Sequence, residues 1–231
     1  MNQYEPTYPR TADQVVIAQN SLIRQVYAWM GMGLLVTALL AYATISSPAL
    51  SAAVMGNRLI FYGLMIGELG LVIGLSSAIN RLSSGTATLM FLIYSALNGV
   101  TLSVIFRVYT AETIGSTFLV TAGMFGAMSL YGATTKKDLT SWGSFLFMGL
   151  IGVVIASVVN IFMGNSALSW IISAIGVIVF TGLTAYDTWK IKEMAAAGAG
   201  GRKPAIIGAL TLYLDFINLF LMLLRFTARE R

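Results

Sequence analysis

Long apolar segments alternate with short polar ones along almost the whole of this chain. Each segment has about the length that a helix needs to cross a bilayer, which is roughly 20 residues for a 30 Å hydrocarbon core. The pattern predicts seven transmembrane helices, at residues 26–45, 59–79, 86–106, 114–134, 142–163, 169–187 and 204–225. We therefore expect an all-α membrane protein in which residues 25–231 form one seven-helix transmembrane domain.

The segment 1–24 is polar and forms a separate N-terminal tail in this interpretation. Thr11 and Gln14 have the spacing of a capping box, in which two side chains satisfy the free N–H groups that begin a helix. Apolar residues follow the box, so part of the tail is predicted to form an interfacial helix before the first span. Residues 1–10 are predicted to be disordered.

The composition supports a membrane protein and excludes several kinds of site. Apolar residues make up 57% of the chain and charged residues only 10%, whereas soluble domains have about 25% charged residues. The chain contains neither cysteine nor histidine. Disulfides, thiol catalysis, histidine general bases and Cys/His metal sites are therefore excluded, and we expect neither a cofactor nor enzymatic activity.

The basic residues predict the orientation of the chain in the membrane. The predicted spans place nine of the fourteen lysines and arginines on the side of the N-terminus, and five on the other side. Basic residues collect on the cytoplasmic side of membrane proteins. The N-terminus is thus predicted to be cytoplasmic and the C-terminus to lie outside, in the periplasm of a bacterium. Because the positive charges are scattered between spans, no nucleic-acid partner is expected.

One acidic residue lies close to the middle of the last predicted span. Asp215 is ten residues from both Ala205 and Arg225, which is about 15 Å along a helix. A carboxylate at this depth costs about 2.5–3.5 kcal/mol on insertion scales, and such residues face a protein interior or a wet cavity. We therefore expect the C-terminal helix to be central and to be wrapped by the other six.

Two further acids lie within spans or at their edges. Asp187 ends the sixth span in the sequence GLTAYD, which resembles the GALTLYLD around Asp215. If these helices are neighbours, the two carboxyl groups can share one proton and respond to pH as a unit. Asp215 is predicted to lie deeper than Asp187, so contact requires the sixth span to reach further inward or the seventh to begin later. An interfacial ion pair of Asp187 with Lys190 is the structural alternative.

The second predicted span carries a glutamate and two pairs of glycines. Arg225 can extend down from the end of the last span, and we interpret Glu68 and Arg225 as a structural ion pair. The glycine pairs at 63/67 and 70/74 have GxxxG spacing, which allows helix backbones to approach closely. We interpret these glycines as helix-packing positions.

Three segments of the chain resemble the Bax inhibitor family, and the bacterial inner-membrane members most of all. They are AYDTWKIK at the end of the sixth span, GALTLYLDFINLFLMLLRF in the last, and GMFGAMSLYGATTKKDL at the fourth. The resemblance implies a central last helix and a pH-sensitive calcium leak. It also implies an aspartate pair at Asp187 and Asp215, and a latch from an arginine after the second span, for which Arg81 is the nearest candidate. A pair of Glu68 with Arg225 is implied as well.

A calcium leak agrees with the chemistry of these residues. Calcium takes six to eight oxygen ligands, and Asp187, Asp215, Asn218 and backbone carbonyls can offer a weak, transient site. Tyr186 and Tyr213 precede the two aspartates and are candidates for the ion path. Acid is expected to protonate the aspartate pair, release the latch and increase flux. Calcium and protons are then the permeant and regulating ions, and membrane lipid surrounds the protein.

Three other functions compete with the leak channel. The chain can be a non-conducting regulator that binds another membrane protein, such as a membrane protease, or a proton-coupled ion antiporter. An intramembrane aspartyl protease also has two aspartates on consecutive spans, the first of them after a tyrosine. Its second motif is Gly-x-Gly-Asp, however, and this chain has Leu212-Tyr213-Leu214-Asp215 instead. The protease is therefore the least favoured of the three.

Overall fold

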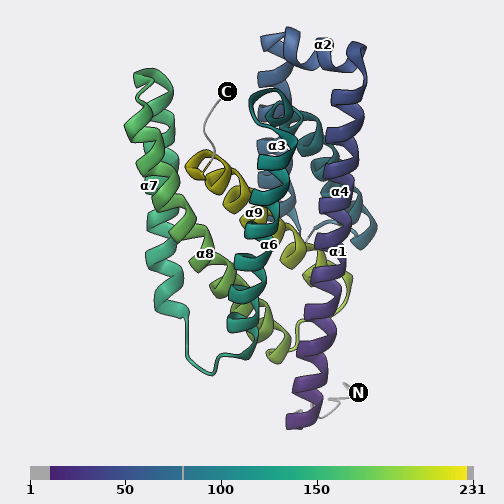
Figure 1. The fold of residues 1–231 in the computed structure, drawn as a ribbon. Coiled ribbons are helices and arrows are strands. Elements are labelled where there is room, and N and C mark those ends of the chain that lie inside the picture. The colour runs from purple at the N-terminus through teal and green to yellow at the C-terminus, as the bar shows by residue number, and fades with distance from the viewer. Residues whose placement is uncertain (1–10, 80, 228–231) are drawn as a thin grey trace.

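A computed structural model describes residues 11–79 and 81–227, and it is built from helices (Figure 1). Seven of the described segments are long and apolar enough to cross a membrane. The predicted all-α membrane protein is thereby confirmed. The helices are α1 (Ala12–Ser46), α2 (Pro48–Gly56), α3 (Arg58–Ala78), α4 (Ser84–Leu102), α5 (Ile105–Val108), α6 (Ala111–Thr134), α7 (Thr140–Met163), α8 (Ser166–Ala196) and α9 (Arg202–Thr227).

The helix α1 joins the predicted interfacial helix and the first span into one element of 35 residues. Its predicted capping box forms, because the Gln14 side chain accepts from the Thr11 N–H at 3.0 Å and the Thr11 hydroxyl accepts from the Gln14 N–H at 3.4 Å. At 1.5 Å per residue, α1 is about 52 Å long and exceeds the hydrocarbon core. The disorder predicted for residues 1–10 lies outside the described residues.

The helix α8 continues nine residues beyond Asp187, where the sixth span was predicted to end. Charged residues of this extension alternate with buried apolar ones such as Ile191, so the extension keeps one face in the core. The ammonium of Lys192 donates to the Thr135 carbonyl at 2.7 Å and ties the extension to the loop between α6 and α7. Asp187 therefore lies about 14 Å from the end of its helix.

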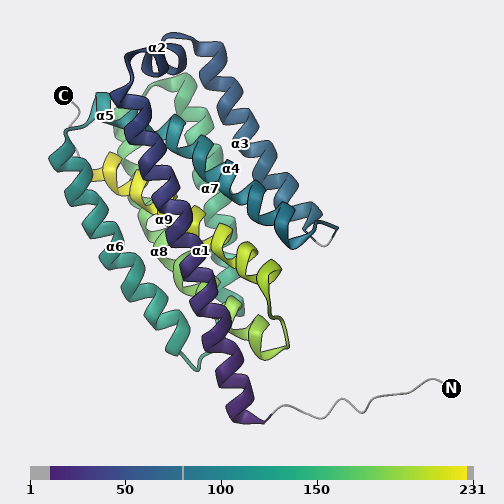
Figure 2. The same ribbon diagram turned by 90° about the vertical axis from the view of Figure 1, so that its right-hand side faces the viewer.

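The last helix, α9, is the most buried of the spans. In its most apolar stretch of 18 residues about 72% is buried inside the protein, against 6% in the corresponding stretch of α3 and 11% in that of α7. It packs mainly against α8, α1, α6 and α4, whereas α3 rests on α4, and α7 on α8 (Figure 2). Four helices, rather than the six of the sequence interpretation, supply most of its surroundings.

Three of the four glycines in the pairs of α3 do not pack against another helix, so their interpretation as packing positions was wrong. A Cβ added at Gly63, Gly67 or Gly70 would meet nothing within 4 Å. A Cβ at the fourth, Gly74, would lie 3.8 Å from the Met90 side chain of α4, which is an ordinary contact distance. The close approaches are made elsewhere. Gly99 of α4 lies against the Thr37 carbonyl of α1, and Gly132 of α6 lies against the Ala185 carbonyl of α8. These backbone contacts are possible because glycine has no side chain.

Candidate functional site

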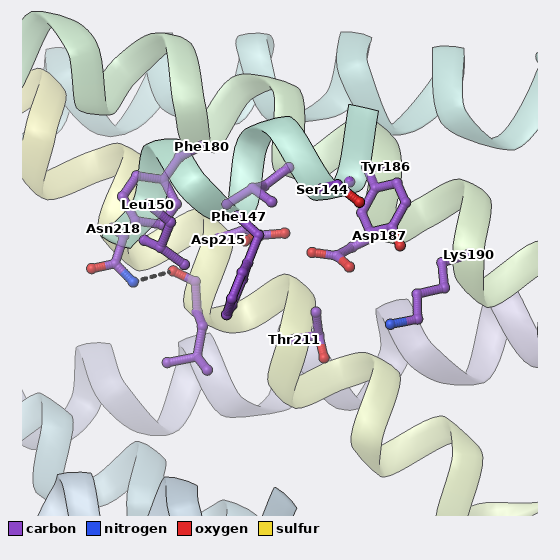
Figure 3. A pocket seen from close by; sticks show the side chains of 13 residues that line it. Ser144, Phe147, Leu150, Phe180, Tyr186, Asp187, Lys190, Thr211, Asp215 and Asn218 are labelled. Carbon is purple, nitrogen blue, oxygen red and sulfur yellow. Dashed lines mark hydrogen bonds between the residues drawn. The ribbon is translucent and has the colours of Figure 1, made fainter. Parts of the chain in front are cut away.

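The helices α8 and α9 bring Asp187 and Asp215 into one cavity of about 510 Å³ (Figure 3). Asp215 is thirteen residues from the start of α9, and Asp187 is nine from the end of α8. The extension of α8 is therefore what lowers Asp187 to the depth of Asp215, so the span does reach further inward. The two carboxyl groups face each other within interaction range.

Asp215 occupies an inner position at this site. Its side chain is only 5% exposed, and its Oδ2 atom has no hydrogen-bond partner among the described residues. An unpaired carboxylate is costly at such a depth, and two adjacent carboxylates repel each other when both are ionised. If the two carboxyl groups shared a single proton, one of the two charges would be removed and a hydrogen bond would be supplied.

Lys190 is the cation that faces the aspartate pair. It lies one helical turn after Asp187, and its ammonium is 5.9 Å from the centroid of the Tyr186 ring. The field of this ammonium acts on the Asp187 carboxyl group, although the two form no ion pair within 4.0 Å in the described structure. Asp187, Lys190 and Thr211 also line a neighbouring cavity of about 250 Å³. Lys190 thus lines both cavities, and Figure 3 shows its place beside Asp187 in the larger one.

Arg81 is not part of the site, and its prediction as the latch was wrong. It is exposed in the turn between α3 and α4, and neither helix packs substantially against α8. The residues that line the two cavities at Asp187 include Lys190 and no arginine. Because Lys190 belongs to the same helix as Asp187, it cannot hold two helices together as a latch does.

Two of the predicted ion-path residues do line the aspartate cavity. Tyr186 lies beside Asp187, with its ring packed on Gly143 of α7. Asn218 is three residues beyond Asp215, and its side-chain N–H group donates to the Leu214 carbonyl at 2.8 Å. This hydrogen bond fixes the amide and leaves its oxygen available to a cation.

Tyr213 faces away from the aspartates, so its assignment to the same ion path was wrong. It is two residues from Asp215, which places it on the opposite side of α9. Its fully buried hydroxyl donates to the Asn98 Oδ1 atom at 3.1 Å and lies 2.6 Å from the Thr37 hydroxyl. Tyr213 therefore ties α9 to α4 and α1.

Glu68 and Arg225 line a third cavity, of about 330 Å³, but they do not form the predicted ion pair. The Glu68 carboxylate instead accepts from the Thr101 hydroxyl at 2.8 Å and from the Asn98 amide at 3.4 Å. The physical reason is the position of α3, which packs against α4 and so aims Glu68 at that helix. Arg225 is exposed at the end of α9.

These contacts predict how stability changes in two double-mutant cycles. Glu68→Gln and Arg225→Gln should have additive effects on the free energy of unfolding, within about 0.5 kcal/mol, because the two residues do not pair. Glu68→Gln and Thr101→Val should be coupled by about 0.5 kcal/mol or more, because their side chains share a hydrogen bond. Denaturant unfolding in detergent micelles measures both cycles. Strong coupling to Arg225 and none to Thr101 would contradict the arrangement.

The sequence interpretation missed several polar residues of these cavities, among them Asn98, Thr101 and Thr211. Asn98 was detectable as an amide in the interior of a predicted span, because such a group needs a partner in hydrocarbon. Threonines give a weaker signal because their hydroxyl groups can bond to their own helix, as Thr101 also does.

The described residues contain no group of three or more histidine, cysteine or acidic side chains that could hold a metal ion. The aspartate cavity offers two carboxyl groups and the Asn218 amide oxygen. This set is smaller than the six to eight oxygens that calcium prefers. It suits brief occupancy by a partly hydrated cation rather than tight binding.

Comparisons with known proteins agree with the resemblance seen in the sequence. The family model described as "Inhibitor of apoptosis-promoting Bax1" matches residues 19–231. The inner membrane protein YbhL of Escherichia coli K12 is 53% identical over 232 residues, covering 97% of this chain and 99% of its own. An uncharacterized protein of Borreliella burgdorferi is 46% identical, over 94% and 96% of the two chains. One of Caulobacter vibrioides is 39% identical over the full length of both. This integral membrane protein thus belongs to the Bax inhibitor family.

Proposed function

We propose that this protein is a pH-sensitive leak channel for calcium, gated by Asp187 and Asp215. The observation that carries the proposal is the meeting of two carboxyl groups, from neighbouring spans, in one cavity inside the bundle. Intramembrane acids are costly and are characteristic of ion and proton pathways. The name of the Escherichia coli relative supports a place in the bacterial inner membrane.

Weak binding suits a leak better than storage or buffering of calcium. Conduction requires a site that attracts an ion and also releases it. Two carboxyl groups, the Asn218 amide and backbone oxygens provide attraction without a closed shell of ligands. The channel makes and breaks no covalent bond and needs no cofactor. Its ligands are calcium and protons.

The gating proposal rests on the charges that face the pair. The titratable groups lining the two cavities at Asp187 are Asp187, Asp215, Lys190 and Tyr186. While Asp187 is ionised, it attracts the Lys190 ammonium to the junction of the cavities, where a fixed positive charge repels an entering cation. Acid protonates the pair and frees Lys190. Lower carboxylate charge also weakens calcium binding, and we propose that release of Lys190 outweighs this loss.

Purified protein in liposomes that contain a calcium-sensitive dye tests the leak directly. Calcium influx should exceed that of protein-free liposomes and should increase as the external pH is lowered from 8 toward 6. Lys190→Gln should increase the flux at alkaline pH, because the neutral amide no longer repels calcium at the junction. Flux equal to that of empty liposomes at every pH would contradict the channel.

A topology experiment tests the proposed orientation. The ends of α1 and α9 near the termini lie on opposite faces of the bundle (Figure 1). With the N-terminus in the cytoplasm, a C-terminal reporter that is active only in the periplasm should be active in cells. The same reporter attached before residue 11 should be silent. The opposite pair of results would reverse the direction of the channel.

A non-conducting regulator is the second candidate, and the family description favours it by naming inhibition of another protein. Such a regulator needs a partner such as a membrane protease, but no ion flux. The liposome experiment separates the two functions, because only the channel transports calcium without a partner. A proton-coupled antiporter would also use the aspartates, but its calcium flux would reverse with an imposed proton gradient.

A further inference from the structure

One face of α9 is less covered than the rest of the helix. Partly exposed side chains recur at Ile207, Thr211, Leu214, Asn218 and Leu221, which are three or four residues apart, while most others are buried. This spacing places them in one stripe along the helix. The stripe is open because neither α3 nor α7 packs substantially against α9, whose ribbon is visible between them (Figure 1).

Two cavities follow this open face in sequence order. The aspartate cavity is lined by Thr211, Leu214, Asp215 and Asn218 of α9, together with residues of α7 and α8. The cavity at Glu68 begins at Leu221 and is bounded by α3, α4 and α5. Asn218 and Leu221 are three residues apart, a rise of about 4.5 Å along the helix axis. The cavities are therefore separated by about one turn of α9.

The cavity at Glu68 has several oxygen-bearing side chains in its own wall. Glu68 is held by Thr101 and Asn98, and Asn98 is in turn held by the Tyr213 hydroxyl of α9. This chain of hydrogen bonds fixes a carboxylate beside the open face of α9, on the side toward Arg225. Each cavity thus contains at least one carboxylate and an amide group, and Leu221 lies on the open face between them.

We propose that the two cavities are the halves of one aqueous route along the open face of α9. In this conformation the route is closed at the turn that carries Leu221, and Glu68 is its second cation-binding position. The inference rests on the proposed channel. It adds the half of the ion path that lies beyond Leu221, which the aspartate pair does not define. An apolar side chain at a narrow point excludes water and hence hydrated ions. Small movements around Leu221 would then be enough to connect the halves.

The absence of cysteine from the chain allows a clean accessibility experiment with single introduced cysteines. A charged, membrane-impermeant methanethiosulfonate reagent is applied separately to the two faces of proteoliposomes of known orientation. Met65→Cys, in the cavity at Glu68, should react from the C-terminal face. Its neighbour Ile66→Cys is the matched control, because Ile66 is 71% exposed but lies outside the cavity. It faces lipid and should react at least tenfold more slowly.

The aspartate half has a similar pair of variants on α9. Asn218→Cys should react from the N-terminal face, whereas its fully buried neighbour Leu219→Cys should be unreactive. The closure is tested by Leu221→Ser, which should increase calcium flux several-fold and make Asn218→Cys reactive from both faces. Leu119→Ser, on the lipid-exposed side of α6, should change neither property.

The outcomes separate this inference from the proposed function. Equal reactivity of Met65→Cys and Ile66→Cys overturns the aqueous route even if wild-type protein leaks calcium. Unchanged flux and one-sided labelling in Leu221→Ser overturn the closure at that turn. A third outcome is the expected cysteine labelling with no calcium flux in any variant. It supports the aqueous route and overturns the calcium channel, because charged reagents would then enter a path that calcium does not use.

Discussion

Asp215→Asn should make calcium flux through the reconstituted protein nearly independent of pH between 6 and 8. Asparagine has almost the same size as aspartate but cannot gain or lose a proton in this range. The change leaves Asp187 without the neighbouring carboxyl group with which we propose it shares a proton. Asp187→Asn should have the same effect from the other side of the pair. The measurement is the initial rate of dye fluorescence at a series of pH values.

Asp138→Asn is the matched control for these two variants. Asp138 lies in the loop before α7, where hydrogen bonds from Thr140 lower the pKa of its exposed carboxyl group below the usual range. It stays ionised at neutral pH, so its replacement should leave the pH profile intact. A wild-type profile in both Asp187→Asn and Asp215→Asn would exclude the pair as the pH sensor, even if the leak itself is real.

Gly132→Val should destabilise the bundle by about 1–3 kcal/mol or more, the range found when side chains are forced into filled space. A Cβ at Gly132 would collide with the Ala185 carbonyl of α8, and a backbone atom cannot turn aside as the end of a side chain can. The two helices would have to separate at their crossing. The free energy of unfolding in detergent micelles, or the midpoint of thermal unfolding, measures the loss.

Gly126→Val provides the comparison on the same helix. A Cβ at Gly126 meets nothing within 4 Å, so this substitution should change stability by less than about 0.5 kcal/mol, as surface substitutions usually do. Equal losses at the two glycines would show that the added side chain destabilises the protein wherever it is placed on this helix. The close approach of α6 to α8 would then not be the cause.

The helices and the protected position of Asp215 were predictable from the sequence for a simple physical reason, whereas the pairing of Asp187 with Asp215 was implied by the family resemblance. Bilayer thickness imposes a length on every span, and a carboxylate inside a span must find a protected place. The depth of Asp187 in the membrane was harder to predict, because a prediction from hydropathy places the end of a span at the first charged residues. The charged extension after Asp187 keeps an apolar face in the core through Ile191 and Ala195, and it therefore stays helical.

The wrong predictions concern which faces of helices meet. The family resemblance implied a latch arginine after the second span, for which Arg81 is the nearest candidate, but a position along the chain does not say where a side chain lies across the bundle. Glu68 and Arg225 do line the same cavity, yet a hydroxyl and an amide on α4 are the direct partners of Glu68. The GxxxG spacing of α3 likewise shows that close packing is possible, but three of its four glycines have no neighbour within 4 Å of an added Cβ, although α3 packs against α4.

The attachment of α3 has a consequence for how the protein is made. During membrane insertion, α3 is synthesised before α4, and at that stage Glu68 has neither Thr101 nor Asn98 as a partner. A lone acidic side chain opposes release of a helix from the translocon into lipid. Only five residues of the chain separate the end of α3 at Ala78 from the start of α4 at Ser84, so the missing hydroxyl and amide arrive with the very next helix. The two should therefore enter the bilayer together as a helical hairpin, with Glu68 already hydrogen-bonded across it.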